Sequence, residues 1–260
     1  MAATSHLLTT MLATTGDGLC RASDLLLSRR RETPSPPLAT DIPDLDTLLG
    51  GGLERGSLTE LVGRPSSGRF AILLTALQRI TSSGEPAALI DQGAHLDPQS
   101  AATAGIDLER LLWVCPKRLP DSLAAAELLV ATGFPLVVID LGLPPVKGRA
   151  PLAAWLRLAR RTAEYRAVAL VSSPYRVSGC AANTVVIAGK TRGRWYGRPG
   201  DVRTLEGSRS LLELAKHKDH KPEAHVRLTL TLPEAVFGTS VENEPRATID
   251  QEEFYDARSL

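Results

Sequence analysis

The sequence has only three cysteines, and they lie too far apart to form a metal-binding or redox motif. They are Cys20, Cys115 and Cys180, and two of them have apolar or small neighbours. A secreted fold held by disulfides needs more cysteines than this, so we expect buried free thiols in a reducing compartment.

Long apolar runs are also missing. No run approaches the roughly 20 residues needed to cross a bilayer. The N-terminus does not begin with a basic segment followed by an apolar one, as a secretory signal does. With 43% hydrophobic and 23% charged residues over 260 positions, the composition is typical of a globular chain with one large core. We therefore expect a cytoplasmic protein that does not contact a membrane.

Short apolar runs recur along the middle of the chain, and helical stretches separate most of them. The runs cover residues 57–63, 86–91, 111–115, 136–140 and 167–173. Runs that are apolar on both faces are typical of parallel strands, so this order predicts an α/β fold with a mainly parallel twisted sheet flanked by helices. After Val171, NTVVIAG, SLLELAKHK and AHVRLTLTL follow without helices between them. They predict an antiparallel C-terminal extension of the sheet.

The two ends of the chain differ from this core, which we place at residues 38–232. Residues 1–37 are predicted to be a helical segment followed by a proline-rich linker, because prolines interrupt a helix. Residues 233–260 contain seven acids and two arginines, a net charge of −5, which predicts a flexible acidic tail. Phe254 and Tyr255 stand in its charged end and are candidate partner-binding residues; disorder without function is the alternative.

Residues 63–70, GRPSSGRF, have the spacing of a phosphate-binding loop without its reactive side chains. The pattern G-x-x-x-x-G-K-[ST] needs Lys to reach the phosphates and Ser or Thr to hold Mg²⁺. Arg69 and Phe70 stand at those two positions. The amides of a following helix could still bind an anion, and a plain strand-to-helix turn is the alternative. The candidate residues of this degenerate nucleotide loop are Gly63, Ser66, Ser67, Gly68 and Arg69.

The sequence around this loop resembles the RecA recombinase family. The lead-in DIPDLDTLLGGGLERG, the loop itself and the exit LIDQGAHLDP occur in the family's order and spacing. LVVID looks like the family's second acidic strand, and LAKHK is similar to its late strand with a K-x-K pair. The resemblance covers about residues 38–232 and implies a RecA-like fold.

The same resemblance implies an ATPase, but four positions depart from it. Arg69 presents a planar fork in place of a compact ammonium, and Phe70 cannot ligate Mg²⁺. Gly93 stands where the family has its water-activating Glu, and Ser100 stands where an aromatic residue stacks on adenine. We therefore predict a protein that is not an enzyme, with no catalytic residue, no cofactor and no metal. These four positions argue against the remaining alternative, an active recombinase-type ATPase.

Basic residues gather between positions 149 and 221, where fifteen Lys and Arg residues face five acids, a net charge of +10. In 152–165, helical spacing sets the arginines opposite a face with Leu152, Trp155 and Leu156. A second cluster interleaves basic residues with Trp195 and Tyr196, which suits a phosphate backbone with stacked bases. A solvated helix face and a structural hairpin with an aromatic plug are the alternatives. The DNA-binding candidates are Arg149, Arg157, Arg160, Arg161, Arg176, Lys190, Arg192, Arg194, Arg198, Lys216 and Lys218.

In the RecA family, DNA is bound by two loops that follow the second acidic strand and the fifth strand. The matching stretches, LGLPPVKGRAP and SSPYRVSGCAANT, are shorter here, although Lys147, Arg149, Tyr175 and Arg176 remain available. Lys216 and Lys218 match the K-x-K pair and are left to contact DNA phosphates or carboxylates of a partner.

The lost ATP-binding positions and the chain length resemble the ImuA group, the RecA-like accessory proteins of bacterial mutagenic repair. This resemblance implies a non-catalytic DNA-binding adaptor in SOS-type damage tolerance and translesion synthesis. Its partners would be non-specific single- or double-stranded DNA, an ImuB-like protein, an error-prone polymerase and RecA, whose filaments it would cap to restrain recombination. A homo-oligomer is a further option. The alternative is a SulA-type inhibitor of the tubulin-like division protein, a partner that gives no reason for the basic segment.

Overall fold

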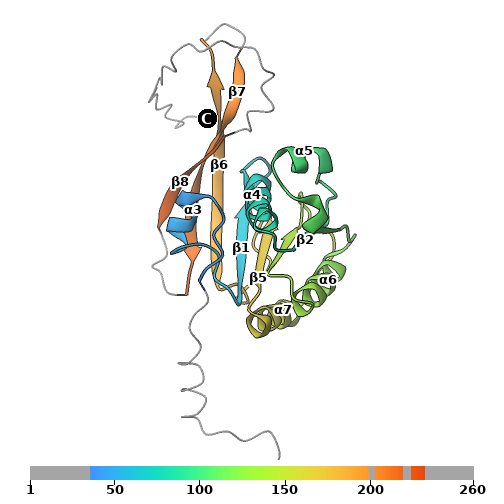
Figure 1. The fold of residues 1–260 in the computed structure, drawn as a ribbon. Helices are drawn as coiled ribbons and strands as arrows, with labels where there is room; N and C mark the ends of the chain where they lie inside the picture. Colours follow the sequence, from blue (N-terminus) through green and yellow to red (C-terminus); the bar gives the residue numbers. More distant parts are fainter. Residues whose placement is uncertain (1–35, 199–202, 219–223, 232–260) are drawn as a thin grey trace, which may run out of the picture.

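The computed structural model describes residues 36–198, 203–218 and 224–231 (Figure 1). Within them, eight strands form one sheet in the order β3-β2-β4-β5-β1-β6-β7-β8. The strands are β1 (Ser57–Gly63), β2 (Ala87–Asp91), β3 (Leu111–Val114), β4 (Leu136–Asp140), β5 (Val168–Ser173), β6 (Thr184–Tyr196), β7 (Thr204–Lys216) and β8 (His225–Thr231). The helices are α3 (Pro43–Leu48), α4 (Arg69–Ser82), α5 (Pro98–Thr103), α6 (Leu119–Ala131), α7 (Leu152–Tyr165) and the 3-10 helix η1 (Leu108–Arg110).

The predicted α/β fold with a mainly parallel sheet and antiparallel C-terminal strands is confirmed. β7 runs antiparallel to β6, and β8 runs antiparallel to β7. We expected NTVVIAG to belong to the antiparallel extension, but β6 pairs in parallel with β1 on one side and antiparallel with β7 on the other. A loop, without a helix, carries the chain from β5 across β1 to β6.

The buried Glu60 of β1 holds that crossing loop. Its carboxylate accepts hydrogen bonds from the Val177 N–H, at 2.7 Å, and from the hydroxyls of Ser173 and Ser178. Three donors compensate a buried carboxylate for the water it has lost. The short loop therefore has a defined path without a covering helix.

Helices cover both faces of the sheet's parallel part, and each face has its own apolar cluster. α3, α4 and α5 contribute to one cluster, whereas α6 and α7 contribute to the other. On α7 the predicted apolar face is confirmed at Trp155 and wrong at Leu152 and Leu156, which are exposed. Ala154 and Leu158 are buried instead. The arginines of α7 point to solvent as predicted.

The strand β3 lies at the edge of the sheet and is only half-buried. It pairs with β2 on one side, and Leu112 and Trp113 are exposed. Cys115, which follows β3, and Cys180, in the loop before β6, are both exposed free thiols. The expectation of buried thiols is therefore wrong for these two; Cys20 lies outside the described residues.

The long strands β6 and β7 extend past the carboxyl ends of the parallel strands (Figure 1). β6 pairs with β1 only as far as Ala188, and from Thr191 to Tyr196 it pairs with β7. We call residues 189–198 and 203–210 the arm. Along the described part of the chain, none of the helices is of a length and apolarity that would take it through a membrane.

Candidate functional site

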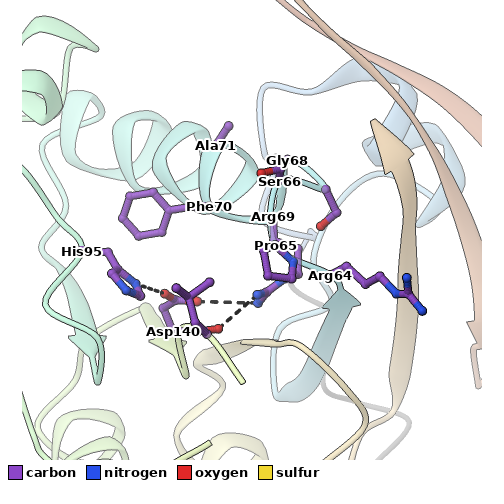
Figure 2. Close-up of a pocket in the computed structure, with 12 residues that line it drawn as sticks. Arg64, Pro65, Ser66, Gly68, Arg69, Phe70, Ala71, His95 and Asp140 are labelled. Atoms are coloured by element: carbon purple, nitrogen blue, oxygen red, sulfur yellow. Dashed lines mark hydrogen bonds and ion pairs between the residues drawn. The ribbon is translucent and has the colours of Figure 1, made fainter. Parts of the chain in front are cut away.

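The degenerate loop of residues 63–68 borders an open cavity of about 350 Å³ (Figure 2). The cavity lies where β1, β2 and β4 end, which is where parallel α/β sheets bind their ligands. Its lining consists of Arg64, Pro65, Ser66, Ser67, Gly68, Arg69, Phe70, Ala71, His95, Asp140, Gly142 and Leu143.

The loop contains two residues with a left-handed backbone and a tightly packed glycine. Ser66 and Gly68 have positive φ angles of 62° and 86°. A Cβ atom at Gly63 would lie 2.5 Å from the Ser67 hydroxyl and 2.9 Å from the Ala188 carbonyl, so only glycine fits there. The Ser67 hydroxyl is buried and has no hydrogen-bond partner among the described residues.

Arg69 points away from this loop, toward the ends of the strands. Its guanidinium donates to the Ser172 hydroxyl and to the Gly142 carbonyl, and it lies 3.7 Å from the Asp140 carboxylate. Burial lowers the pKa of Arg69, and the charge of Asp140 partly opposes that shift. The cation is thus engaged within the protein.

His95 lies at the cavity beside Gly93 and Asp140. Its Nδ1 lies 3.6 Å from Asp140, so this carboxylate sits between His95 and Arg69 (Figure 2). A Cβ atom at Gly93 would lie 2.2 Å from His95 Cε1. The absence of a side chain at Gly93 therefore leaves the space that the imidazole needs. Sequence reasoning missed His95, although its position next to the glycine was visible.

Three side chains here could hold a metal ion by their geometry. Ligand atoms of Asp91, His95 and Asp140 lie within 4.8 Å of one another. Asp91 already accepts the N–H groups of Gly93 and Leu96, and Asp140 faces the Arg69 cation. Because a fixed positive charge already compensates this cluster, it does not require a metal.

The two remaining departures from the ATP-binding pattern, Phe70 and Ser100, have structural roles. Phe70 is half-buried and packs against the apolar cluster under α4. Ser100, at the adenine-stacking position, donates from its backbone and hydroxyl to Asp97, which caps α5. These hydrogen bonds lower the pKa of Asp97.

The two stretches that match the family's DNA-binding loops are tied together. The Val146 N–H donates to the Tyr175 hydroxyl, and the Gln92 amide donates to the Lys147 carbonyl at 2.7 Å. Arg149 and Arg176 are exposed in these stretches. The loops present basic side chains on a fixed backbone.

The arginines of α7 and the outer face of the C-terminal strands lie on the same side of the sheet. Arg157, Arg160 and Arg161 are exposed; Arg157 pairs with Glu127 and Arg161 with Glu164. On β7, Glu213 stands opposite Ile187, which packs into the cluster under α6 and α7. Because side chains alternate along a strand, Leu211 and Arg209 also face this side.

Sequence reasoning did not single out Arg209 and Arg227, which complete a cluster of basic side chains on this side of the sheet. Arg192 stands directly opposite Arg209, and Arg227 of β8 stands opposite Leu211. Lys190, Arg192 and Arg198 are exposed, whereas Arg194 pairs with Glu206 at 3.4 Å. We call Lys190, Arg192, Arg209 and Arg227 the basic face. Cross-strand pairing, which the sequence alone does not reveal, brings the three arginines together, and Lys190 lies in the irregular part of β6 next to them.

The structure also places the candidate aromatic residues of the hairpin and the two lysines of the K-x-K pair. Trp195 and Tyr196 are exposed, so the aromatic plug of a closed hairpin is wrong. Lys218 is exposed, but the Lys216 ammonium donates to the carbonyls of Cys180 and Ala182. Lys216 therefore fastens the crossing loop to β7. Phe254 and Tyr255 lie outside the described residues.

Replacing Lys216 by Met tests this fastening role. We expect the free energy of unfolding to fall by about 1–3 kcal/mol, because two carbonyls, one of them on the buried Ala182, lose a charged donor. The DNA affinity should change less than about twofold. Lys218→Met is the matched control and should leave stability unchanged, as denaturant titration would show; equal effects of both variants would contradict the assignment.

Comparison with known proteins gives one family match. Residues 18–146 match the RecA N-terminal domain family. The chain is 36% identical to Protein RecA of Clavibacter michiganensis over 122 residues, which are 46% of this chain and 34% of that protein. It is 38% identical to Protein RecA of Picosynechococcus over 97 residues, 37% of this chain and 28% of that protein. The chain thus spans about a third of the length of the curated relatives it matches.

Among solved structures, the fold is similar to a crystal structure of the RadB recombinase. The TM-score is 0.56 at 18% identity, and the match covers 75% of this chain and 96% of that one. At this identity the likeness shows the fold alone. It agrees with the mostly parallel sheet and its antiparallel C-terminal strands.

Proposed function

We propose that this distant homologue of RecA is a DNA-binding accessory protein of DNA repair that does not hydrolyse ATP. The observation that carries the proposal is the engagement of Arg69 with Asp140 beside a basic face on the neighbouring strands. The finer assignment is to damage tolerance by translesion synthesis, in the manner of the ImuA group. In that role the protein joins DNA to an ImuB-like protein, an error-prone polymerase and RecA.

The state of the cavity supports a protein without ATP turnover. Phosphoryl transfer needs a cation on the outer phosphates, a Mg²⁺ ligand and a group that orients water. Arg69 is directed to Asp140, Phe70 packs in the core, and Gly93 makes room for His95. Arg69 and Phe70 thus have structural contacts, and the imidazole of His95 fills the space at Gly93. One reversion would therefore not restore the reaction.

The basic face supports DNA as the partner. Arg192 and Arg209 are directly opposite each other, and like charges in that position destabilise a sheet. A phosphate between them would remove the repulsion. On the same side of the sheet, Arg157 and Arg161 of α7 already pair with acids, so the positive charge is concentrated on the C-terminal strands.

The opposite edge of the sheet supports a protein partner. β3 pairs with β2 alone among the described strands, and its exposed Leu112 and Trp113 offer apolar contacts beside a free strand edge. A partner such as RecA could therefore bind this edge while the basic face holds DNA. Capping of a filament, which would restrain recombination, would use this arrangement.

DNA binding and ATP turnover are the direct tests. Fluorescent single- and double-stranded oligonucleotides should bind at 50 mM salt, and the affinity should fall steeply at 200 mM because each phosphate contact contributes about 0.9 to the salt slope on duplex. Phosphate release from ATP should be absent with and without DNA. The variant Arg69→Lys with Phe70→Thr should stay inactive, because Gly93 supplies no general base.

Two results would contradict the proposed function. Failure to bind either oligonucleotide at 50 mM salt would remove DNA as the partner. ATP turnover by the wild type that is lost on changing Arg69 would make the protein a motor.

A further inference from the structure

Two buried carboxylates stand side by side where β2 and β4 end. Asp91 and Asp140 are the last residues of these strands, and the parallel register pairs them directly. Arg69 forms an ion pair with Asp140, whereas Asp91 accepts only the backbone N–H groups of Gly93 and Leu96. One guanidinium therefore faces two buried carboxylates. Buried charges in proteins are paired or bind a metal ion, so this excess of negative charge indicates a second cation.

The imidazole of His95 is held beside the carboxylates in space that two glycines leave. A Cβ atom would lie 2.2 Å from His95 Cε1 if built on Gly93, and 2.9 Å from the same atom if built on Gly142. His95 Nδ1 lies 3.6 Å from Asp140 Oδ2, whereas the Arg69 pair is formed by Asp140 Oδ1 (Figure 2). Asp140 thus offers one oxygen to Arg69 and the other to the side of His95.

These three side chains suit a particular class of metal ion. One ligand atom from each of Asp91, His95 and Asp140 lies within 4.8 Å of the other two. Ligand atoms that surround a zinc ion at about 2.0–2.2 Å stand roughly 3–4 Å apart, so small adjustments bring the three onto one ion. An imidazole ligand favours zinc, cobalt or nickel over Mg²⁺, which prefers oxygen. His95 and Asp140 also line the cavity, which leaves room for water as a further ligand.

We propose that Asp91, His95 and Asp140 form a binding site for a divalent transition-metal ion of the zinc class. The ion supplies the positive charge that Asp91 lacks. Arg69 compensates Asp140 without it, so folding does not require the metal. The site is separate from the Mg²⁺ ligand of the phosphate-binding pattern, whose position Phe70 occupies. This inference departs from our sequence-based expectation of no metal, and it does not depend on DNA binding.

Titration of the untagged, EDTA-stripped full chain with ZnCl₂ tests the proposal by calorimetry. The wild type should bind one Zn²⁺ per chain, and MgCl₂ should not displace it. His95→Gln should weaken Zn²⁺ binding at least about tenfold, since the loss of even an outer contact to a ligand costs that much. His217 and His220 stand three positions apart in the sequence. Their replacement by Ala in one double variant is the matched control and should leave Zn²⁺ affinity unchanged.

Two further variants keep all three ligands. Gly93→Ala places a methyl group in the space of the imidazole and should weaken Zn²⁺ binding about tenfold. Arg69→Met removes a cation beside Asp140 and should instead strengthen Zn²⁺ binding at least about tenfold. Zn²⁺ should also raise the melting temperature of Arg69→Met more than that of the wild type, because the ion replaces the lost charge. A general defect in folding would not produce a gain in affinity.

The outcomes keep this site apart from the proposed function. Absence of Zn²⁺ binding by the wild type, or equal affinity in His95→Gln, would overturn the site. Loss of binding in the variant of His217 and His220 alone would place the metal there and overturn it as well. Oligonucleotide binding measured in EDTA tests the proposed function by itself, so either proposal can fail while the other stands.

Discussion

A variant with Lys190, Arg192 and Arg209 replaced by Gln should bind duplex DNA at least about 30-fold more weakly at 50 mM salt. Three fewer phosphate contacts should also lower the salt slope by about 2.7, since each contributes about 0.9. Arg192 and Arg209 share one face of β6 and β7, Lys190 is exposed next to them, and none of the three belongs to an apolar cluster. Fluorescence anisotropy at several salt concentrations measures both quantities.

The stability of the same variant should move in the other direction. Arg192 and Arg209 repel each other across the strands, and neutral side chains there should add about 0.2–1 kcal/mol to the free energy of unfolding. A gain in stability with a loss of affinity is the expected mark of a functional surface. Arg110, Lys117 and Arg118 replaced by Gln form the matched control at the other edge. A comparable loss of affinity there would mean that net charge, and not this surface, binds DNA.

The sequence was sufficient to predict the parallel part of the fold because its strands are buried on both faces. Every residue of β2, β4 and β5 is buried, so their apolar runs are continuous. The direction of β6 was not predictable in this way, because it follows from the path of a loop that Glu60 holds through contacts about 117 residues apart.

At the candidate site, the sequence showed which ATP-binding side chains are missing, but not which contacts the substituted residues make in the folded protein. Arg69, Phe70 and Gly93 were recognised as departures from a known pattern. That Arg69 turns toward Asp140, and that His95 fills the space beside Gly93, depends on strands that meet only in the folded sheet. Lys216 was misread as a surface residue for the same reason, since its carbonyl partners belong to a distant loop.

The replacement of Asp140 by Asn should destabilise the protein by about 3 kcal/mol. Both charges of the pair are buried, with 8% of the Arg69 side chain and 5% of the Asp140 side chain exposed. Removing the carboxylate leaves a largely buried guanidinium without this counter-charge, and that cost exceeds the loss of the pair itself. Denaturant unfolding followed by circular dichroism measures the difference.

The double variant Arg69→Met with Asp140→Asn should recover most of that loss, because no uncompensated charge remains. The losses of unfolding free energy in the two single variants should therefore add up to about 2 kcal/mol more than the loss in the double variant. This difference is well above the few tenths expected of independent sites. His95 lies near the same carboxylate and should soften the effect of Arg69→Met alone. Additive losses would show that Arg69 and Asp140 do not stabilise each other, and the cation would then be free to serve an anion in the cavity.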